Sequence, residues 1–243
     1  MSEKKIRSMS SKGGGVNISE IFLFQTLADL KYPIKNIFII GNAFGFSTIL
    51  LSLMFPQAKV IAIDAGCEGK DNMKGIELTN TICKKHNLDA AVEYGFSPQN
   101  TKEVIQKHFG SNKIDLCFID GLHTNEQLLL DFEESQKYCH TDTLYFMHDV
   151  INWKMQEAFQ KIQEKIATTH KSDILWRTQS GMALSVPKDN KSLLFYMQCF
   201  TEHKSNIDKV REYAKKDKQT SRKIARLLPR RLVEIIKKVV NKT

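Results

Sequence analysis

The sequence predicts an α/β protein built on a doubly wound, mostly parallel sheet of seven strands, followed by a C-terminal helical extension. Short runs rich in β-branched and aromatic residues alternate with segments of helical length and spacing. The strand-like runs are almost continuously apolar, as strands are when helices cover both faces of a parallel sheet. Such alternation is typical of parallel sheets with helices on both sides.

The individual elements follow from these patterns. The expected strands are residues 36–41, 59–64, 90–95, 114–120, 144–150, 172–179 and 181–187, with a turn at Ser180 and Gly181 between the last two. The expected helices between them are residues 46–55, 72–87, 100–109 and 125–139. A further helix, with Phe22, Leu23, Leu27 and Leu30 on its apolar side, leads into the first strand.

The distribution of charge divides the chain. Its net charge is +9, and 42% of its 243 residues are apolar, which is enough for one main domain. Residues 201–243 carry 14 of the 36 Lys and Arg but only 5 of the 27 Asp and Glu, so the rest carries 22 of each. We therefore expect a flexible N-terminus at residues 1–17, a main domain at 18–200 and a basic tail at 201–243.

The tail has two interpretations. Apolar residues recur at spacings of three and four within residues 219–242, with Lys and Arg on much of the other side. A basic amphipathic helix of this kind can lie on an anionic membrane surface. Alternatively, its apolar side packs on the main domain or on a second subunit, which would make the protein a homo-oligomer.

Other features indicate a cytoplasmic protein. The N-terminal segment lacks the apolar core of a secretory signal, and the longest apolar stretches are too short to span a bilayer. The five cysteines are scattered, without a C-x-x-C pair, as expected for free thiols in a reducing compartment. Trp153 and Trp176 are expected in the core or in a cleft wall rather than as stacking platforms.

A glycine turn follows the first expected strand. Gly41 and Gly45 in "GNAFG" would let the backbone turn tightly and approach a ligand, beside the free N–H groups of the next helix. Asp64 ends the second strand about twenty residues later, the spacing at which a carboxylate accepts the hydroxyls of a ribose. Alternatively, the glycines only permit the turn, and Asp64 is a helix cap or a solvated loop residue.

Acidic and imidazole side chains follow the fourth and fifth strands. Asp120 and His123 lie in "IDGLH", and His148 and Asp149 follow "LYFM". Because neighbouring parallel strands end at one edge of the sheet, these four side chains should face one cleft. Carboxylates with an imidazole can bind a divalent metal, and a neutral histidine can remove a proton from a hydroxyl. Alternatively, the carboxylates are loop caps and the histidines make structural hydrogen bonds.

These motifs, in the order "FIIGNAFGFST", "VIAIDAG", "YGFSPQN", "DLCFIDGLHTNEQLLLDF" and "LYFMHDV", resemble the class I S-adenosylmethionine-dependent methyltransferases. The branch that they resemble has I-D-G-x-H after the fourth strand and H-D after the fifth, and it includes small-molecule and sugar O-methyltransferases. The resemblance covers roughly residues 18–187 and implies a Rossmann-like fold and an enzyme that methylates a hydroxyl of a small molecule or glycan.

The resemblance also implies roles for individual residues. The residues that would bind S-adenosylmethionine are Gly41, Asn42, Ala43 and Gly45 at its methionine part, Asp64 at its ribose and Ser97 near its adenine. Mg²⁺ or another divalent metal would be held by Asp120, Asp149 and His148. His123 would be the general base, assisted by Asp120.

Three other functions compete with this interpretation. The basic tail would suit an RNA methyltransferase, but the sequence has no recognisable RNA-binding appendage, so nucleic acid is not an expected partner. A dinucleotide-dependent oxidoreductase would use Asp64 similarly, but it needs a more complete glycine pattern. A non-catalytic adaptor could keep the fold and bind through the tail.

Overall fold

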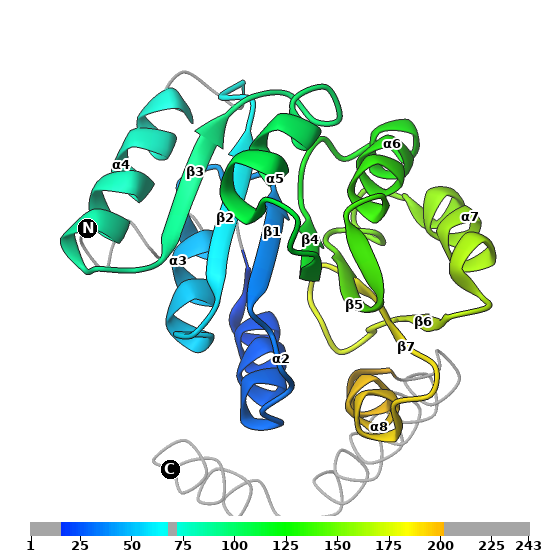
Figure 1. The fold of residues 1–243 in the computed structure, drawn as a ribbon. Coiled ribbons are helices and arrows are strands. Elements are labelled where there is room, and N and C mark those ends of the chain that lie inside the picture. Colours follow the sequence, from blue (N-terminus) through cyan, green and yellow to red (C-terminus); the bar gives the residue numbers. More distant parts are fainter. Residues whose placement is uncertain (1–15, 68–71, 202–243) are drawn as a thin grey trace, which may run out of the picture. The chain divides into compact units, whose positions relative to one another are not determined.

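The computed structural model describes residues 16–67 and 72–201, which form a sheet with helices on both faces (Figure 1). The sheet has seven strands in the order β3-β2-β1-β4-β5-β7-β6. The strands are β1 Asn36–Ile40, β2 Lys59–Asp64, β3 Ala90–Tyr94, β4 Ile114–Ile119, β5 Cys139–Met147, β6 His170–Ile174 and β7 Ala183–Pro187. The predicted seven-stranded, mostly parallel sheet is confirmed.

The order of the strands reverses between β1 and β4. β1 pairs in parallel with β2 on one side and with β4 on the other, and β4 pairs in parallel with β5. Only β7 runs antiparallel to its two neighbours, β5 and β6, among the described strands. Ligands of open parallel sheets bind beyond the carboxyl ends of the strands at such a reversal. The segments after β1 and β4 are therefore the place to look for a site.

The helices divide into two layers, and each layer buries one side of the sheet. The helices are α2 Ile18–Asp29, α3 Phe46–Met54, α4 Asn72–Lys85, α5 Thr101–Phe109, α6 Asn125–Gln136, α7 Gln156–Ile166 and α8 Lys191–Phe200. Apolar side chains of α2, α3, α4 and α8 form one core with the sheet, and those of α5, α6 and α7 form the other.

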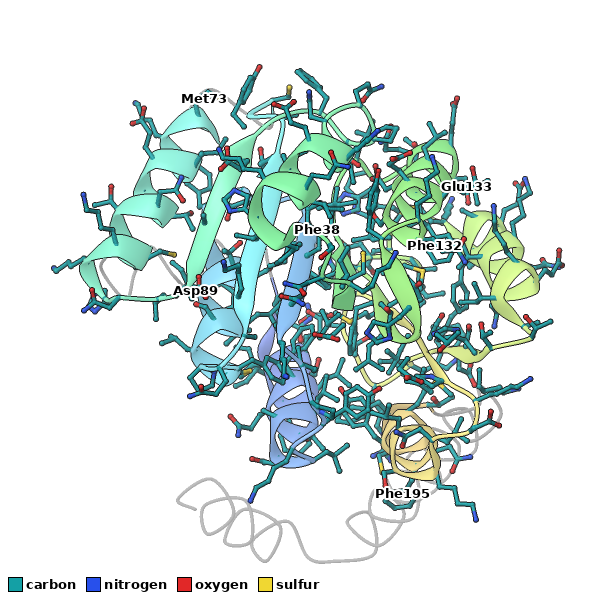
Figure 2. The ribbon with its side chains drawn as sticks, viewed as in Figure 1. Phe38, Met73, Asp89, Phe132, Glu133 and Phe195 are labelled. Atoms are coloured by element: carbon teal, nitrogen blue, oxygen red, sulfur yellow. The ribbon has the colours of Figure 1, made fainter. Side chains whose placement is uncertain are left out.

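Successive side chains of β1 point to opposite faces of the sheet, so β1 contributes to both hydrophobic cores. Ile37 and Ile39 face the layer of α2 and α3, whereas Phe38 and Ile40 face α5 and α6. In Figure 2, Phe38 and Phe132 lie among the side chains between the sheet and the α5–α6 layer. This two-sided burial explains why the sequence of β1 is apolar at nearly every position.

Several predicted boundaries were wrong. The helix expected at residues 125–139 ends at Gln136, and β5 begins at Cys139 rather than at residue 144. The first four residues of β5, "CHTD", are half-buried or exposed and mostly polar, so this part lacks the apolar signature of a buried strand. The strand expected at 172–179 is β6, which ends at Ile174, so Trp176 lies in the turn before β7.

Two helices were not predicted. Helix α7 buries Ala158, Phe159, Ile162 and Ile166, and its spacing of three and four was present in the sequence. Helix α8 carries a similar pattern in "KSLLFYMQCF" and buries four residues against α2 and β7. The helix expected from Phe22 to Leu30 is confirmed as α2, but its Phe22 and Leu30 are exposed.

The N-terminal segment 1–15 and the tail 202–243 lie outside the described residues, and so do the predictions made for them. Within residues 16–67 and 72–201, no helix combines the length and apolarity required to cross a bilayer.

Candidate active site

The glycine turn after β1 is a tight left-handed segment pressed against the end of β4. Gly41 has φ +93° and Gly45 has φ +86°, values that L side chains rarely adopt. A Cβ on Gly41 would lie 2.0 Å from the backbone oxygen of Asp120. Both glycines are thus required by the packing, and the turn directly adjoins the first residue after β4.

Asp64 holds this turn in place. Its Oδ2 accepts hydrogen bonds from the backbone N–H groups of Asn42 (2.6 Å) and Ala43 (2.8 Å), and its Oδ1 accepts one from Gly66 (2.7 Å). The residue is only 8% exposed. Asp64 is therefore neither a helix cap nor a solvated loop residue, because its carboxylate links the ends of β1 and β2.

The side chain of Asn42 is also used within the turn. Its Oδ1 accepts from the hydroxyl of Thr48 (2.8 Å), and its Nδ2 donates to the hydroxyl of Thr79 (3.2 Å) and to the carbonyl of Ala43 (3.1 Å). Any contact of Asn42 with a ligand would therefore involve its backbone. Sequence analysis missed both threonines because their positions in helices α3 and α4 carry no local signal.

Ser97, after β3, belongs to a polar group beside the same edge. Its hydroxyl donates to Oδ1 of Asp131 (2.6 Å), and its carbonyl accepts from Nε2 of Gln127 (2.8 Å). Burial raises the pKa of Asp131, although the hydrogen bonds from Ser97 and Gln127 oppose that shift. This group fixes the loop after β3 against α6.

The four residues predicted to share a cleft come together in the structure. One side-chain donor atom from each of Asp120, His123, His148 and Asp149 lies within 4.8 Å of the others. Oδ1 of Asp120 lies 3.2 Å from Nε2 of His123 and 3.0 Å from Nδ1 of His148. Oδ2 of Asp149 lies 3.7 Å and 3.5 Å from the same two nitrogens.

The backbone aims Asp149 into the cluster. Asp149 has φ +56°, an unusual conformation for a residue other than glycine, and strain of this kind concentrates at functional sites. Its Oδ1 accepts a hydrogen bond from Nδ2 of Asn152 (2.8 Å), which leaves Oδ2 facing the two histidines.

The electrostatics of the cluster oppose the effect of burial. Burial favours the neutral acid, but the charge of His148 and the hydrogen bond from His123 lower the pKa of Asp120 to about 2. Burial likewise favours a neutral imidazole, but Asp120 raises the pKa of His148 well above its usual range. The pKa of His123 is also raised, against burial, by its hydrogen bond to Asp120. Shifts of this kind are common at active sites.

Two residues that sequence analysis did not assign to the site complete it. Glu20, fully buried on α2, places Oε2 3.2 Å from Nε2 of His148. Trp153 is 59% exposed, and its ring stacks on that of His123 with the centroids 5.4 Å apart and the planes 7° from parallel. Trp153 is thus not a core residue, and its place beside His123 agrees with the alternative prediction of a cleft-wall residue.

The donor set of the cluster fits a divalent cation. Nδ1 of His148 is buried and has no hydrogen-bond partner among the described residues, although Oδ1 of Asp120 is near. A buried polar atom without a partner is costly, and a cation held by it and by two carboxylates would remove that cost. The other nitrogen of His148 faces a carboxylate, as is usual for histidines that bind metals.

One protein-family model matches the central part of this chain. A family model described as a methyltransferase domain matches residues 38–150. This segment extends from β1 to just beyond β5 and contains the glycine turn and the whole four-residue cluster. A comparison with curated protein sequences finds no significant match.

Solved structures of O-methyltransferases share this architecture. A Staphylococcus aureus protein assigned as a caffeoyl-CoA O-methyltransferase is 17% identical, with a TM-score of 0.58 over 77% of this chain and 93% of that one. An O-methyltransferase from Bacillus cereus, solved with SAH, is 18% identical, with a TM-score of 0.57 over 76% and 90%. TomG from Streptomyces achromogenes, solved with SAM, is 14% identical, with a TM-score of 0.56 over 77% and 90%. At these identities the likeness concerns the fold.

Proposed function

We propose that the protein is a class I S-adenosylmethionine-dependent O-methyltransferase, on the basis of the methyltransferase-domain model that matches residues 38–150. The acceptor is a hydroxyl of a small molecule or of a sugar or glycan. The observation that supports the proposal is the packing of the glycine turn against Asp120, because a methyl donor bound at this turn would lie beside two histidines and two carboxylates.

The donor lies along the carboxyl edge of β1, β2 and β3. In the proposal, Gly41, Asn42, Ala43 and Gly45 approach its methionine part through their backbone, Asp64 binds its ribose and Ser97 lies near its adenine. Two features support this assignment. The positive φ values of Gly41 and Gly45 let the turn form without a side chain at these two positions, and three backbone hydrogen bonds fix the carboxylate of Asp64 at the end of β2.

His123 is the proposed general base. Its Nε2 faces Oδ1 of Asp120, so a proton on Nε2 is held by that carboxylate, and Nδ1 is the nitrogen that accepts the proton of the acceptor hydroxyl. Asp120 raises the pKa of His123, which makes the imidazole a stronger base than a free one. The ring of Trp153 restrains the imidazole plane by stacking. Together these contacts orient the base.

Asp120, His148 and Asp149 would hold the divalent metal. A bound Mg²⁺ or similar ion would act as a Lewis acid that lowers the pKa of a coordinated hydroxyl. The remaining task of the site is alignment, because the methyl group of a sulfonium is already activated and in-line displacement needs the acceptor oxygen behind it. The exposed face of Trp153 provides an apolar surface beside His123 for a small acceptor or a sugar ring.

Calorimetric titration with S-adenosylmethionine, S-adenosylhomocysteine and NAD tests the cofactor. We expect both methionine derivatives to bind and NAD not to bind. Binding of NAD alone would indicate an oxidoreductase, and binding of none of the three would favour a non-catalytic adaptor.

Turnover with a panel of hydroxyl acceptors then tests the reaction and the metal. We expect methyl transfer that is lost in a chelator and restored by Mg²⁺. Full activity in the chelator would show that the reaction needs no metal, and the proposed role of His123 as general base would be unaffected. Methylation of RNA in place of the small acceptors would move the function to the alternative suggested by the basic tail.

A further inference from the structure

Glu20 has a burial and a set of partners that its position in a helix does not explain. It is the third residue of α2 and forms a capping box with Asn17, whose backbone N–H donates to Oε2 of Glu20 (2.9 Å). A capping-box glutamate needs only that contact, and a charged side chain is almost never fully buried unless it is paired. The side chain of Glu20 is 0% exposed, so further partners must account for its burial.

Those partners come from distant parts of the chain. Oε1 of Glu20 accepts hydrogen bonds from both the backbone N–H (3.1 Å) and the hydroxyl of Ser180. Oε2 accepts from Asn17 and lies 3.2 Å from Nε2 of His148. An ionised carboxylate offers about four acceptor positions. Three are taken by donors from Asn17 and Ser180, and the fourth faces the imidazole.

When the ring of His148 is neutral, as it must be to bind a metal, this arrangement determines which nitrogen carries the single hydrogen. Glu20 receives three donors and acts only as an acceptor, so the nitrogen that faces it, Nε2, must be the donor. In the neutral ring the lone pair is then on Nδ1. That atom is buried, has no hydrogen-bond partner among the described residues, and lies 3.0 Å from Oδ1 of Asp120 and 3.5 Å from Oδ2 of Asp149.

We propose that Glu20 is a positioning residue that holds His148 in the tautomer with hydrogen on Nε2 and thereby directs the Nδ1 lone pair toward a divalent cation shared with Asp120 and Asp149. The inference rests on the proposed metal site and adds to it a residue from outside the matched domain segment. A carboxylate behind a metal-binding histidine fixes the ring and increases its basicity. Through Glu20, the start of α2 and the turn at Ser180 support the metal site.

Metal affinity of the full chain is the first test. Mn²⁺ binding is measured by calorimetry for the wild type, Glu20→Gln and the control Glu126→Gln, which makes the same change at an exposed position in the first turn of α6. In Glu20→Gln an amide N–H₂ must face either His148 or a backbone N–H, so we expect Mn²⁺ affinity to fall about 10- to 100-fold. The control should bind within about twofold of the wild type.

A second readout separates positioning from general damage. Affinity for S-adenosylmethionine should stay within about threefold in Glu20→Gln, since the hydrogen-bond partners of Glu20 are not among the residues proposed to bind the methyl donor. Ser180→Ala removes one donor to Glu20 but keeps the contact with His148, so its loss of Mn²⁺ affinity should be smaller than that of Glu20→Gln. Wild-type Mn²⁺ affinity in folded Glu20→Gln would overturn the inference.

The tautomer can be observed without any change to Glu20. In wild-type protein loaded with Mg²⁺, two-bond ¹H–¹⁵N spectra of the imidazole, assigned with His148→Gln, should show hydrogen on Nε2 and none on Nδ1. Hydrogen on Nδ1 would overturn the inference even if Glu20→Gln failed to fold. Failure of the wild type to bind Mn²⁺ would refute both the proposed metal site and this inference. If that protein still bound S-adenosylmethionine, the proposed methyl transfer would not be refuted.

Discussion

Replacement of Asp64 by alanine should destabilise the protein even without a cofactor. The carboxylate accepts hydrogen bonds from the backbone N–H groups of Asn42, Ala43 and Gly66. The variant keeps the backbone but leaves all three donors without this acceptor. Asn42 is buried, so water cannot easily replace the carboxylate there.

The size of the loss follows from these contacts. A buried donor left unsatisfied costs about 1–3 kcal/mol, and the bonds lost here are to a charged group. One buried donor at Asn42 and two partly buried donors at Ala43 and Gly66 give a loss of about 4 kcal/mol in the free energy of unfolding. That is a large share of the total stability of about 5–15 kcal/mol, and it corresponds to roughly 10 °C in Tm.

Urea denaturation of Asp64→Ala, with Asp89→Ala as the control, measures this loss. Asp89, labelled in Figure 2, is exposed in the loop between α4 and β3, so its replacement should change stability by no more than about 0.5 kcal/mol. A loss below about 1 kcal/mol in Asp64→Ala, at unchanged m-value, would refute the role of the carboxylate in holding the turn.

The same variant separates the structural role of Asp64 from its proposed role at the ribose. S-adenosylmethionine at about 100 times its Kd should stabilise the wild type by about 2.7 kcal/mol. We expect no such increment in Asp64→Ala. A full increment together with the predicted loss of stability would leave Asp64 as a residue of the turn and remove it from the cofactor site.

Three further changes have defined outcomes. In His123→Ala, kcat for methyl transfer should fall about 10²- to 10⁴-fold at unchanged affinity for S-adenosylmethionine. A kcat within about threefold of the wild type would refute the role of His123 as general base. In Gly41→Ala, the new Cβ would meet the Asp120 carbonyl at 2.0 Å, so urea denaturation should show a loss of about 2–5 kcal/mol. Gly110→Ala, also at positive φ (φ +60°, ψ −118°) but with nothing within 4 Å of its Cβ, should lose only the backbone strain of about 1–3 kcal/mol, and a loss in Gly41→Ala no larger than this would refute the packing argument. Burial lowers the pKa of His170 below its usual 6.5, so the unfolded chain binds a proton there that the folded chain does not, and stability is lost as the pH falls below about 6.5. His170→Gln should therefore lose less stability than the wild type between about pH 7.5 and 5.5, and a steeper loss in the variant would contradict this sign.

Local pattern was sufficient for the sheet and for most of its helices. Buried parallel strands must be apolar on both faces, so β1, β2 and β4 stand out in the sequence as short apolar runs. The prediction was poorer where burial is partial, because the first half of β5 is polar and reads as a loop. The sequences of helices α7 and α8 have buried residues at spacings of three and four, so both helices were predictable from local pattern.

The sequence also determined where the chemistry should be sought. Residues that follow parallel strands meet at one edge, so Asp120 and His148 could be placed together from their positions after two apolar runs. The same reasoning placed Gly41 and Asp64 at that edge. Their roles in binding and catalysis remain proposals that the experiments above test.

Tertiary structure alone decided how these groups are supported. Glu20 lies 128 positions from His148 and 160 from Ser180, and Thr79 lies 37 from Asn42. No local pattern encodes such contacts, because they depend on the order of the strands and on how α2 and α4 pack against the sheet. In the sequence segment "NISE", Glu20 forms a capping box with Asn17 at the start of α2. Only the fold shows that the same carboxylate is buried against the imidazole of His148, where an ionised group is stable only if every acceptor position has a donor.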